Sequence, residues 1–343
     1  MDRTKIKTIL LSRVDNLGDA IMVLPMAGVL KKYYPDSQLF FLGQSYQRKI
    51  VESCQHFDGF LDWNEVRDES PELQAEFLAE YQIDVIVHVK PMRPIAVAAK
   101  KAKIPHRIGS SDRIYHFFTC NHIPVQRRKW SKLHEAQMNM RLLSCLLKRV
   151  NYSLDELDHF MGLNQISHYP EITEQYLAKE KFNLILHPLS HGHAKEWPVT
   201  RFLELIKHLP SERYNILVTG TEKEGDVLRK NLLEPYQNKI QDLTGKLSIS
   251  EFMSLISQAD GLVAASTGPL HIAAAMGINT LGLFVQRLQL RPGRYGPIGK
   301  RASVMVHDEQ CPVCLEDRDC DCIKLITAQE VAGKIDEWVK VNG

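Results

Sequence analysis

The sequence lacks any long apolar run and any excess of charge of one sign. No stretch of its 343 residues approaches the roughly 18 uninterrupted apolar residues of a membrane span. The N-terminus MDRTKIKTILLSR has no small-residue cleavage site of a signal peptide, so we expect the chain to stay in the cytoplasm. Because 43 Lys and Arg residues oppose 41 Asp and Glu residues, the net charge gives no case for a nucleic-acid partner. Any anionic partner must therefore meet a local basic patch.

Cysteine is scarce and unevenly placed. The chain has 7 cysteines, an odd number, and four of them lie in the stretch CPVCLEDRDCDC at 311–322. Such crowding does not suit a framework of disulfides. Cys311 and Cys314 form a CxxC pair, and Cys320 and Cys322 form a tighter CxC pair. Four thiolates in one loop can close a structural site for zinc or iron, and an unmetallated cysteine-rich loop is the alternative.

The length and the apolar pattern predict two α/β domains. The chain exceeds what one hydrophobic core usually serves, and its 44% hydrophobic residues are typical of globular proteins. Strand-like runs alternate with helix-compatible segments, which indicates parallel sheets with helices on both faces. We expect domains at 1–168 and 169–325 and a closing helix at 326–343. The expected strands are 7–12, 38–43, 58–63 and 84–89, then 183–188, 214–220, 261–266 and 279–284.

Ligands of open parallel sheets bind at the carboxyl ends of the strands, and a first motif follows the first expected strand. It is SRVDNLGDAIMVLP at 12–25, in which Gly18 permits a tight turn before a helix expected over 16–35. Asp19 falls in the first turn of that helix. It is either a helix cap or a general base that removes a proton from an acceptor hydroxyl, and Asp15 competes for both roles.

A second motif, LHPLSHGHAKEWPVTRF at 186–202, follows the first strand of the second series. Its small residues, among them Ser190, let the backbone approach a ligand, and Lys195 offers a cation to a diphosphate. Trp197 and Pro198 anchor the loop by packing. The motif also holds three histidines, whose spacing matches no familiar zinc pattern: His187, His191 and His193.

A third motif, GLVAASTGPLHIAAAMG at 261–277, reads as a strand, a hydroxyl-rich turn and an Ala-rich helix that ends at Gly277. Exposed amides and the hydroxyls of Ser266 and Thr267 can cradle phosphate oxygens, and the helix dipole adds to the attraction. An ordinary capped helix is the alternative, because Ser and Thr are favoured at helix starts regardless of function.

In this order, the three motifs resemble those of glycosyltransferase family 9, the heptosyltransferases that build the inner core of lipopolysaccharide. HRIG at 106–109 and the helix KLHEAQMNMRLL at 132–143 add to the likeness. The resemblance implies a GT-B fold, with two Rossmann-like domains that face a central cleft and a C-terminal helix that can pack back on the first. It also implies inverting transfer of a heptose from an ADP-sugar, with one base, no covalent intermediate and no metal.

The resemblance assigns roles to individual residues. Asp19 matches the catalytic base, and Lys195 would neutralise the donor diphosphate. Glu222 lies where members place an acid near the ribose, although Glu224 is equally placed. Many members carry an aspartate at the position of Ser266, so the donor sugar stays open. The residues that match the donor-phosphate segment, with Ser266 beside them, are Thr267, Gly268, Pro269, Leu270 and His271.

The acceptor would lie on the first domain, where cations gather. Phosphorylated lipid A and Kdo groups would be drawn to such a surface, with peripheral contact at the cytoplasmic face of the inner membrane. A scatter of solvated cations is the alternative. The principal candidates are Lys90, Arg93 and Arg113, accompanied by Arg107, Arg127, Arg128 and Lys129.

Together these expectations describe an inverting transferase that moves heptose from ADP-heptose to an inner-core lipopolysaccharide acceptor. A transferase or epimerase acting on another nucleotide-sugar is one alternative, and an inactive nucleotide-sugar-binding protein is another. No cofactor is expected for catalysis, and zinc or iron is expected only as a structural ion.

Overall fold

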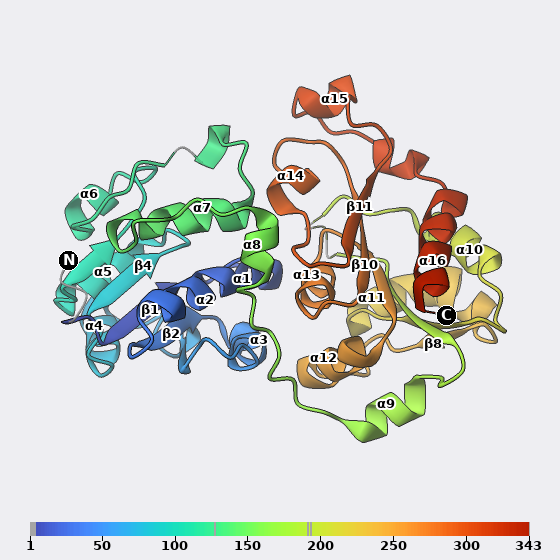
Figure 1. The fold of residues 1–343 in the computed structure, drawn as a ribbon, viewed down its shortest axis with the longest axis horizontal. Coiled ribbons are helices and arrows are strands. Elements are labelled where there is room, and N and C mark those ends of the chain that lie inside the picture. The colour runs from blue at the N-terminus through green and yellow to red at the C-terminus, as the bar shows by residue number, and fades with distance from the viewer. Residues whose placement is uncertain (1–4, 127, 191, 193, 343) are drawn as a thin grey trace. The chain divides into compact units, whose positions relative to one another are not determined.

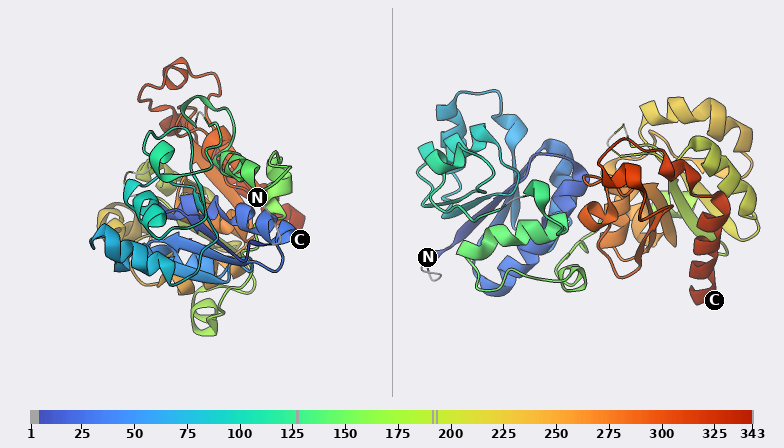
Figure 2. Two further views of the ribbon diagram at one scale, coloured as in Figure 1. Left: turned by 90° about the vertical axis from the view of Figure 1, so that its left-hand side faces the viewer. Right: turned by 90° about the horizontal axis from the view of Figure 1, so that it is seen from above.

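The chain folds as two α/β units, Met1–Gln165 and Ile166–Gly343, each of which has its own parallel sheet with helices on both faces (Figures 1 and 2). This architecture comes from a computed structural model, which describes residues 5–342 except 127, 191 and 193. Two Rossmann-like domains were predicted, and both are present, with the division close to residue 168. Within the described residues no helix is long and apolar enough to cross a membrane.

The first unit has five parallel strands in the order β3-β2-β1-β4-β5. Ser12 at the end of β1 pairs with Leu42 of β2 on one side and His88 of β4 on the other, so the carboxyl ends of the central strands are aligned. The strands are β1 Thr8–Ser12, β2 Gln38–Gly43, β3 Gly59–Asp62, β4 Val85–His88 and β5 His106–Ile108. The helices are α1 Leu17–Ile21, α2 Leu24–Tyr33, α3 Arg48–Glu52, α4 Pro71–Ala79, α5 Arg93–Lys101, α6 His116–Thr119, α7 Glu135–Arg141 and α8 Leu154–Asp158.

The prediction of a single helix over 16–35 is wrong, because the segment forms two helices, α1 and α2, with a break between them. Pro25 stands at the start of α2, where its missing N–H and its ring would disrupt the interior of a longer helix. Asp19 consequently lies in a helix of only five residues, directly beyond the carboxyl end of β1.

The second unit has six parallel strands in the order β11-β10-β9-β6-β7-β8. The strands are β6 Phe182–His187, β7 Tyr214–Val218, β8 Ile240–Asp242, β9 Gly261–Ala265, β10 Asn279–Phe284 and β11 Ala302–Val306. The helices are α9 Pro170–Tyr176, α10 Val199–His208, α11 Glu222–Leu228, α12 Ile249–Gln258, α13 Gly268–Ala275, α14 Pro292–Tyr295, α15 Pro312–Leu315 and α16 Ala328–Asn342.

The eight strands expected from the sequence are confirmed, and the pattern missed β5, β8 and β11. All three lie at an edge of their sheet. β5 and β8 have three residues each, too few for a pattern, and the side chains of β11 are mostly only half-buried. An edge strand that is short or half-exposed carries a weak apolar signal.

The closing helix α16 belongs to the second unit. Trp338 stacks on Phe182 of β6 with ring centroids 6.3 Å apart, and the Tyr214 hydroxyl donates to Asp336 at 2.6 Å. The sequence left open that this helix packs on the first domain. In the structure, residues of this helix belong to the core of the second unit, beside α10.

Replacing Trp338 by Ala should destabilise the second unit by about 3–5 kcal/mol, because it removes a buried aromatic side chain and leaves a cavity. Urea unfolding followed by circular dichroism measures the loss. Glu337→Ala, at an exposed position one residue earlier, should cost less than about 0.5 kcal/mol. Equal losses in the two variants would contradict the assignment of Trp338 to the core.

Candidate functional site

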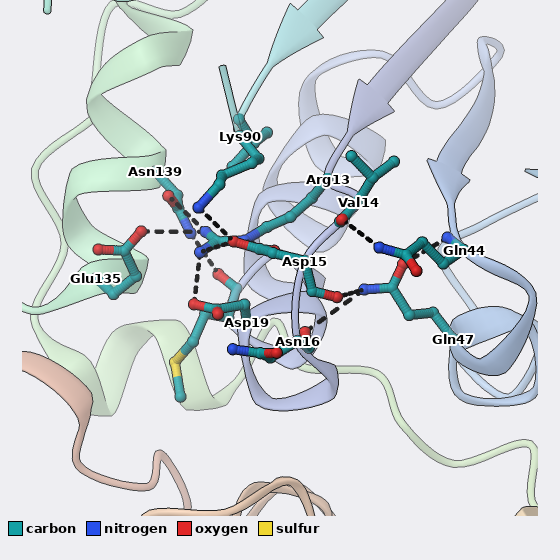
Figure 3. Close-up of polar contacts among 12 residues, drawn as sticks. Arg13, Val14, Asp15, Asn16, Asp19, Gln44, Gln47, Lys90, Glu135 and Asn139 are labelled. Atoms are coloured by element: carbon teal, nitrogen blue, oxygen red, sulfur yellow. Dashed lines mark hydrogen bonds and ion pairs between the residues drawn. The ribbon is translucent and has the colours of Figure 1, made fainter. Parts of the chain in front are cut away.

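A buried arginine organises the carboxyl end of β1. Arg13 follows the strand, its side chain is 3% exposed, and its guanidinium meets three carboxylates (Figure 3). Its Nε lies 2.8 Å from Asp15, one terminal nitrogen lies 2.5 Å from Asp19, and the other lies 3.1 Å from Glu135. Only a guanidinium offers this fork of donors, so one side chain fixes the position of three acids.

The Asp19 carboxyl titrates well above its usual range. Burial raises its pKa to about 6, Arg13 opposes this rise, and the negative charges of Asp15 and Glu135 add to it. Burial alone would lower the pKa of Arg13, but its carboxylate neighbours outweigh burial and raise that pKa further above its usual value. Arg13 therefore stays charged, while Asp19 can hold or release a proton close to neutrality.

The backbone of the loop between β1 and α1 is held by side chains from the turn after β2. Gln44 donates to the carbonyl of Val14 at 2.6 Å, and Gln47 donates to the carbonyl of Asp15 at 2.8 Å (Figure 3). The Tyr46 hydroxyl donates to the same Asp15 carbonyl. Because Gln47 is fully buried, its hydrogen bond restricts the movement of this loop. The same contacts restrict the position of the Asp15 carboxylate.

Helix α7 supplies residues that the sequence analysis did not assign. Glu135 and Asn139 are four apart and share one face of the helix, and both accept hydrogen bonds from Arg13. Arg128 pairs with Glu135 and donates to Asn139 at 3.0 Å, and Asn139 in turn donates to the carbonyl of Met22 at 3.1 Å. The only signal for these two residues in the sequence was the resemblance of the segment 132–143 to the family. Their spacing of four residues lets both side chains reach the same partner.

Three of the expected acceptor-side cations are used within the unit. Lys90 lies 3.2 Å from Asp15 and so joins the Arg13 cluster. Arg107 donates to the carbonyls of Ile104 and Thr119, which ties the chain before β5 to the end of α6. Arg128 points inward, to Glu135 and Asn139.

Arg93 and Arg113 differ from these, because both side chains are exposed. Arg93 is the first residue of α5, and Arg113 lies in the turn before α6. Arg127 lies outside the described residues, as does the side chain of Lys129. The expected basic patch is thus divided between structural cations and exposed ones.

In the second unit, the turn after β9 forms the start of α13. Thr267 is the N-cap residue, and its side chain does not cap the helix. Its hydroxyl oxygen is buried and has no hydrogen-bond partner among the described residues. An unsatisfied buried hydroxyl costs roughly 1–3 kcal/mol, and a helix N-terminus attracts anions. This turn can therefore accept an anionic oxygen, as the third motif predicts.

The donor-phosphate segment is only partly open. Ser266, Gly268 and Pro269 are half-buried, whereas Leu270 and His271 are buried. A ligand at this turn would meet the backbone amide of Leu270 rather than its side chain, because that side chain is fully enclosed in the unit. The helix ends as expected at Gly277, whose φ of +80° is the left-handed conformation that glycine adopts readily.

Lys195 already has carboxylate partners. Its ammonium lies 2.8 Å from Asp319 and 3.7 Å from Asp321, which belong to the cysteine loop. The hydrogen bond that Lys195 donates to Asp319, followed by the charges of both acids, raises the pKa of Lys195. The lysine is thus a cation about one quarter exposed, whose partners a stronger anion can replace.

The rest of the second motif holds its own loop together. The Ser190 amide and hydroxyl both donate to Glu196, at 2.7 and 2.8 Å, and Ala194 donates back to the Ser190 oxygen. Trp197 is buried and donates to the carbonyl of Ile326 at 3.0 Å, which confirms that it anchors the loop. His187 is bonded to Thr219, and His191 and His193 lie outside the described residues.

The two glutamates after β7 differ in their exposure to solvent. Glu224 is buried and completes a capping box with Thr221, whose amide donates to the Glu224 carboxylate at 2.8 Å. Glu222 is exposed at the start of the same helix. Glu224 is therefore occupied as a structural residue, and Glu222 is the acid that a ligand can reach.

The four clustered cysteines come together. All their sulfur atoms lie within 4.8 Å of one another, and this is the one such group of metal-ligating side chains among the described residues. Cys311 lies 3.5 Å from Cys320, and Cys314 lies 3.5 Å from Cys322. Three of the four are buried in the core of the second unit, so the group can hold a structural metal ion.

Comparison with known proteins decides the family. The family model described as glycosyltransferase family 9 (heptosyltransferase) matches residues 75–322. The chain belongs to this family. It is a glycosyltransferase, with the two Rossmann-like domains of the GT-B fold that the motifs implied.

Individual relatives of this glycosyltransferase agree with that assignment. A putative glycosyltransferase of Haemophilus influenzae is 26% identical over 97% of this chain and 96% of its own length. The Escherichia coli ADP-heptose lps heptosyltransferase II shares its fold, with a TM-score of 0.76, 18% identity and coverage of 98% and 99% of the two chains. TibC, an iron-containing dodecameric glycosyltransferase from enterotoxigenic E. coli, matches with a TM-score of 0.57, 15% identity and coverage of 99% and 78%.

The Asp19 carboxyl should titrate with a pKa of about 6 when followed by carbon NMR of labelled aspartate. Asp15→Asn should lower this value, because it removes a nearby negative charge that disfavours the ionised form. Asp68→Asn, at an exposed site, should leave it unchanged. Titration of Asp19 near the usual value of about 4 would contradict the buried cluster.

Proposed function

We propose that this glycosyltransferase moves heptose, with inversion, from ADP-heptose to an inner-core lipopolysaccharide acceptor, and that Asp19 is its general base. The observation that carries the proposal is the place of the Asp19 carboxyl, in the short helix that follows β1 and paired with the buried Arg13, where burial raises its pKa to about 6. A base of pKa about 6 is ionised at neutral pH and still basic enough to accept a proton in the transition state. The structural similarity to the E. coli ADP-heptose lps heptosyltransferase II supports the choice of donor.

In the proposed reaction, the carboxylate of Asp19 takes the proton of an acceptor hydroxyl. The hydroxyl oxygen attacks the anomeric carbon of the heptose on the face opposite ADP, the glycosidic bond forms, and the bond to the diphosphate oxygen breaks. ADP leaves with the bonding electrons, and no covalent enzyme intermediate is needed. Arg13 orients the carboxylate and keeps its pKa from rising further.

On the donor side, the diphosphate would meet the start of α13 and the ammonium of Lys195. The Thr267 hydroxyl and the free amides of the first helical turn would donate to phosphate oxygens. Lys195 would exchange Asp319 for the diphosphate and stabilise the charge that develops as ADP departs. No metal is required for this step.

The remaining donor contacts follow from exposure and chemistry. Glu222 is the acid available to the ribose, and Ser190 keeps the Lys195 loop in shape through Glu196. Ser266 would offer the sugar a short, neutral contact where many relatives have an aspartate. On the acceptor side, Arg93 and Arg113 are the exposed cations that phosphates of lipid A and Kdo can reach, while Lys90 would act through Asp15.

Asp19→Asn should lower kcat by roughly 10²- to 10⁴-fold and leave donor affinity unchanged, because the amide cannot accept the proton. In the wild type, kcat/KM should fall as the pH decreases through about 6, since protonation of Asp19 removes the base. Transfer to a lipid A-Kdo acceptor, read by mass spectrometry, measures both effects. Turnover of Asp19→Asn within tenfold of wild type would rule out this base.

Asp36→Asn, at an exposed position, is the matched control and should have wild-type turnover. The donor is tested on the wild type with ADP-, GDP- and UDP-sugars. Transfer from a sugar other than ADP-heptose would replace the proposed donor. Donor binding by calorimetry without transfer to any acceptor would instead identify a nucleotide-sugar-binding protein.

We also propose that Cys311, Cys314, Cys320 and Cys322 hold one structural iron or zinc ion. At a metal–sulfur distance of about 2.3 Å, tetrahedral geometry separates the sulfurs by about 3.8 Å, close to the pairs observed at 3.5 Å. A shell of four protein ligands leaves no position for catalysis. The ion would fix the loop whose Asp319 and Asp321 hold Lys195.

Elemental analysis of the purified protein should find about one iron or zinc ion per chain. Cys314→Ser should abolish metal binding, because Cys314 is a fully buried member of the group. Cys145→Ser changes a cysteine outside the group and should keep the metal. Wild-type protein free of both metals after expression with added iron and zinc would contradict this part of the proposal.

A further inference from the structure

Apolar side chains are exposed together on one short segment of the first unit. Of the large hydrophobic side chains that the structure describes as exposed, five lie between residues 114 and 130, and the others are spread singly over both units. Scattered exposed apolar residues are normal, but a concentration of this kind marks an interaction surface. We name these five residues the apolar edge: Ile114, Phe117, Phe118, Val125 and Trp130, with exposures of 79%, 58%, 71%, 83% and 73%.

The parts of the segment that carry the apolar edge are joined by hydrogen bonds. The Ser111 amide donates to the carbonyl of Pro124, and Ser111 and Gln126 exchange two hydrogen bonds. The Arg128 amide donates to Asp112 at 3.4 Å. The turn before α6 thus lies beside the segment that leads to Trp130, at the periphery of the first unit in Figure 1.

The protein holds these side chains outward. In α6 the ring of His116 is buried and bonded to the carbonyl of Ser110, while its neighbours Phe117 and Phe118 face solvent. Lys100 donates to the carbonyl of Phe118, and Arg107 donates to that of Thr119, both at 2.8 Å. These hydrogen bonds hold the backbone of α6 in the position that exposes both rings.

The charge around the apolar edge selects its partner. Residues 111–132 contain five Lys or Arg residues, of which Arg128 points inward to Glu135, and a single acid, Asp112, in a chain that is otherwise nearly balanced. Arg113 and Lys132 are exposed within this segment, and Lys100 comes to it from the end of α5. Aromatic residues flanked by cations are typical of surfaces that enter the interface of an anionic bilayer, where rings insert and cations meet lipid phosphates.

We propose that the apolar edge docks the first unit onto an anionic lipid bilayer, with Phe117, Phe118 and Trp130 inserted at the headgroup level. The proposal extends the proposed function, because a glycolipid acceptor is embedded in such a bilayer. It does not depend on which sugar is transferred.

Sedimentation of the full chain with vesicles tests the proposal. We expect binding to vesicles of phosphatidylglycerol and phosphatidylethanolamine, little binding to phosphatidylcholine alone, and weaker binding as salt is raised. Phe117→Ser combined with Phe118→Ser should weaken binding by about tenfold or more. Val227→Ser combined with Leu325→Ser removes exposed apolar side chains elsewhere and should bind as wild type does.

Tryptophan fluorescence identifies the face that docks. Trp130 is exposed, whereas the other three tryptophans, Trp63, Trp197 and Trp338, are buried. The emission should shift to the blue on vesicle binding, and Trp130→Phe should remove the shift and keep the binding. A wild type that does not bind, or binding equal in the Phe117→Ser, Phe118→Ser variant, would overturn the proposal. Self-association that this variant abolishes would show that a second copy of the chain covers the apolar edge instead.

Failure of docking can be told apart from failure of the proposed transfer. The Phe117→Ser, Phe118→Ser variant should retain transfer to a water-soluble, delipidated acceptor and lose transfer to the same acceptor in anionic vesicles. If the wild type transfers to neither acceptor but binds vesicles, the proposed function fails and the docking surface stands. If the variant transfers equally well to both acceptors, the docking surface fails and the proposed function stands.

Discussion

The first unit depends on one buried guanidinium. Arg13 brings the negative charges of Asp15, Asp19 and Glu135 together in a place with little water. Without this cation the three carboxylates would repel one another, and burying them would cost several kcal/mol each. The same arrangement leaves Asp19 with incomplete compensation, which is why its pKa rises although it touches a positive charge. The clustering of the three carboxylates and the raised pKa of Asp19 thus have the same cause, which is the balance between desolvation and ion pairing with Arg13.

The second unit differs from the first in the kind of groups that could bind an anion. It offers hydroxyl and amide donors at the start of α13 and a lysine whose present partners are carboxylates. The donors at the start of α13 are neutral and Lys195 is paired, so neither group leaves an uncompensated charge. The cysteine loop contributes to this balance by carrying Asp319 and Asp321 to Lys195, which connects a group of buried cysteines in the core to the loop after β6.

How much could be predicted differs between features. The buried strands and the places of Asp19, Lys195 and Thr267 follow from local patterns, because each of these residues lies in the loop or the first helical turn after an apolar run. The partnership of Arg13 with Glu135 does not, since 122 residues separate them and only the tertiary fold joins them. The break before α2 could have been predicted from Pro25, because proline disrupts a helix interior. The apolar spacing on either side of Pro25 indicated one helix instead. The exposure of Phe117 and Phe118 was not visible, because an apolar pair in the sequence normally indicates a core.

The ion pair between Lys195 and Asp319 also bears on how tightly any donor is held. A diphosphate that reaches this lysine does not meet a bare charge, and its affinity is the difference between two ion pairs. When the diphosphate replaces Asp319 at Lys195, the net charge around the ammonium changes less than it would if the lysine had no partner. The exchange favours ligands that carry more negative charge than a carboxylate. A ligand whose charge at this position is no greater than that of a carboxylate would then gain little from Lys195, because Asp319 is a competitor that the protein carries within its own chain.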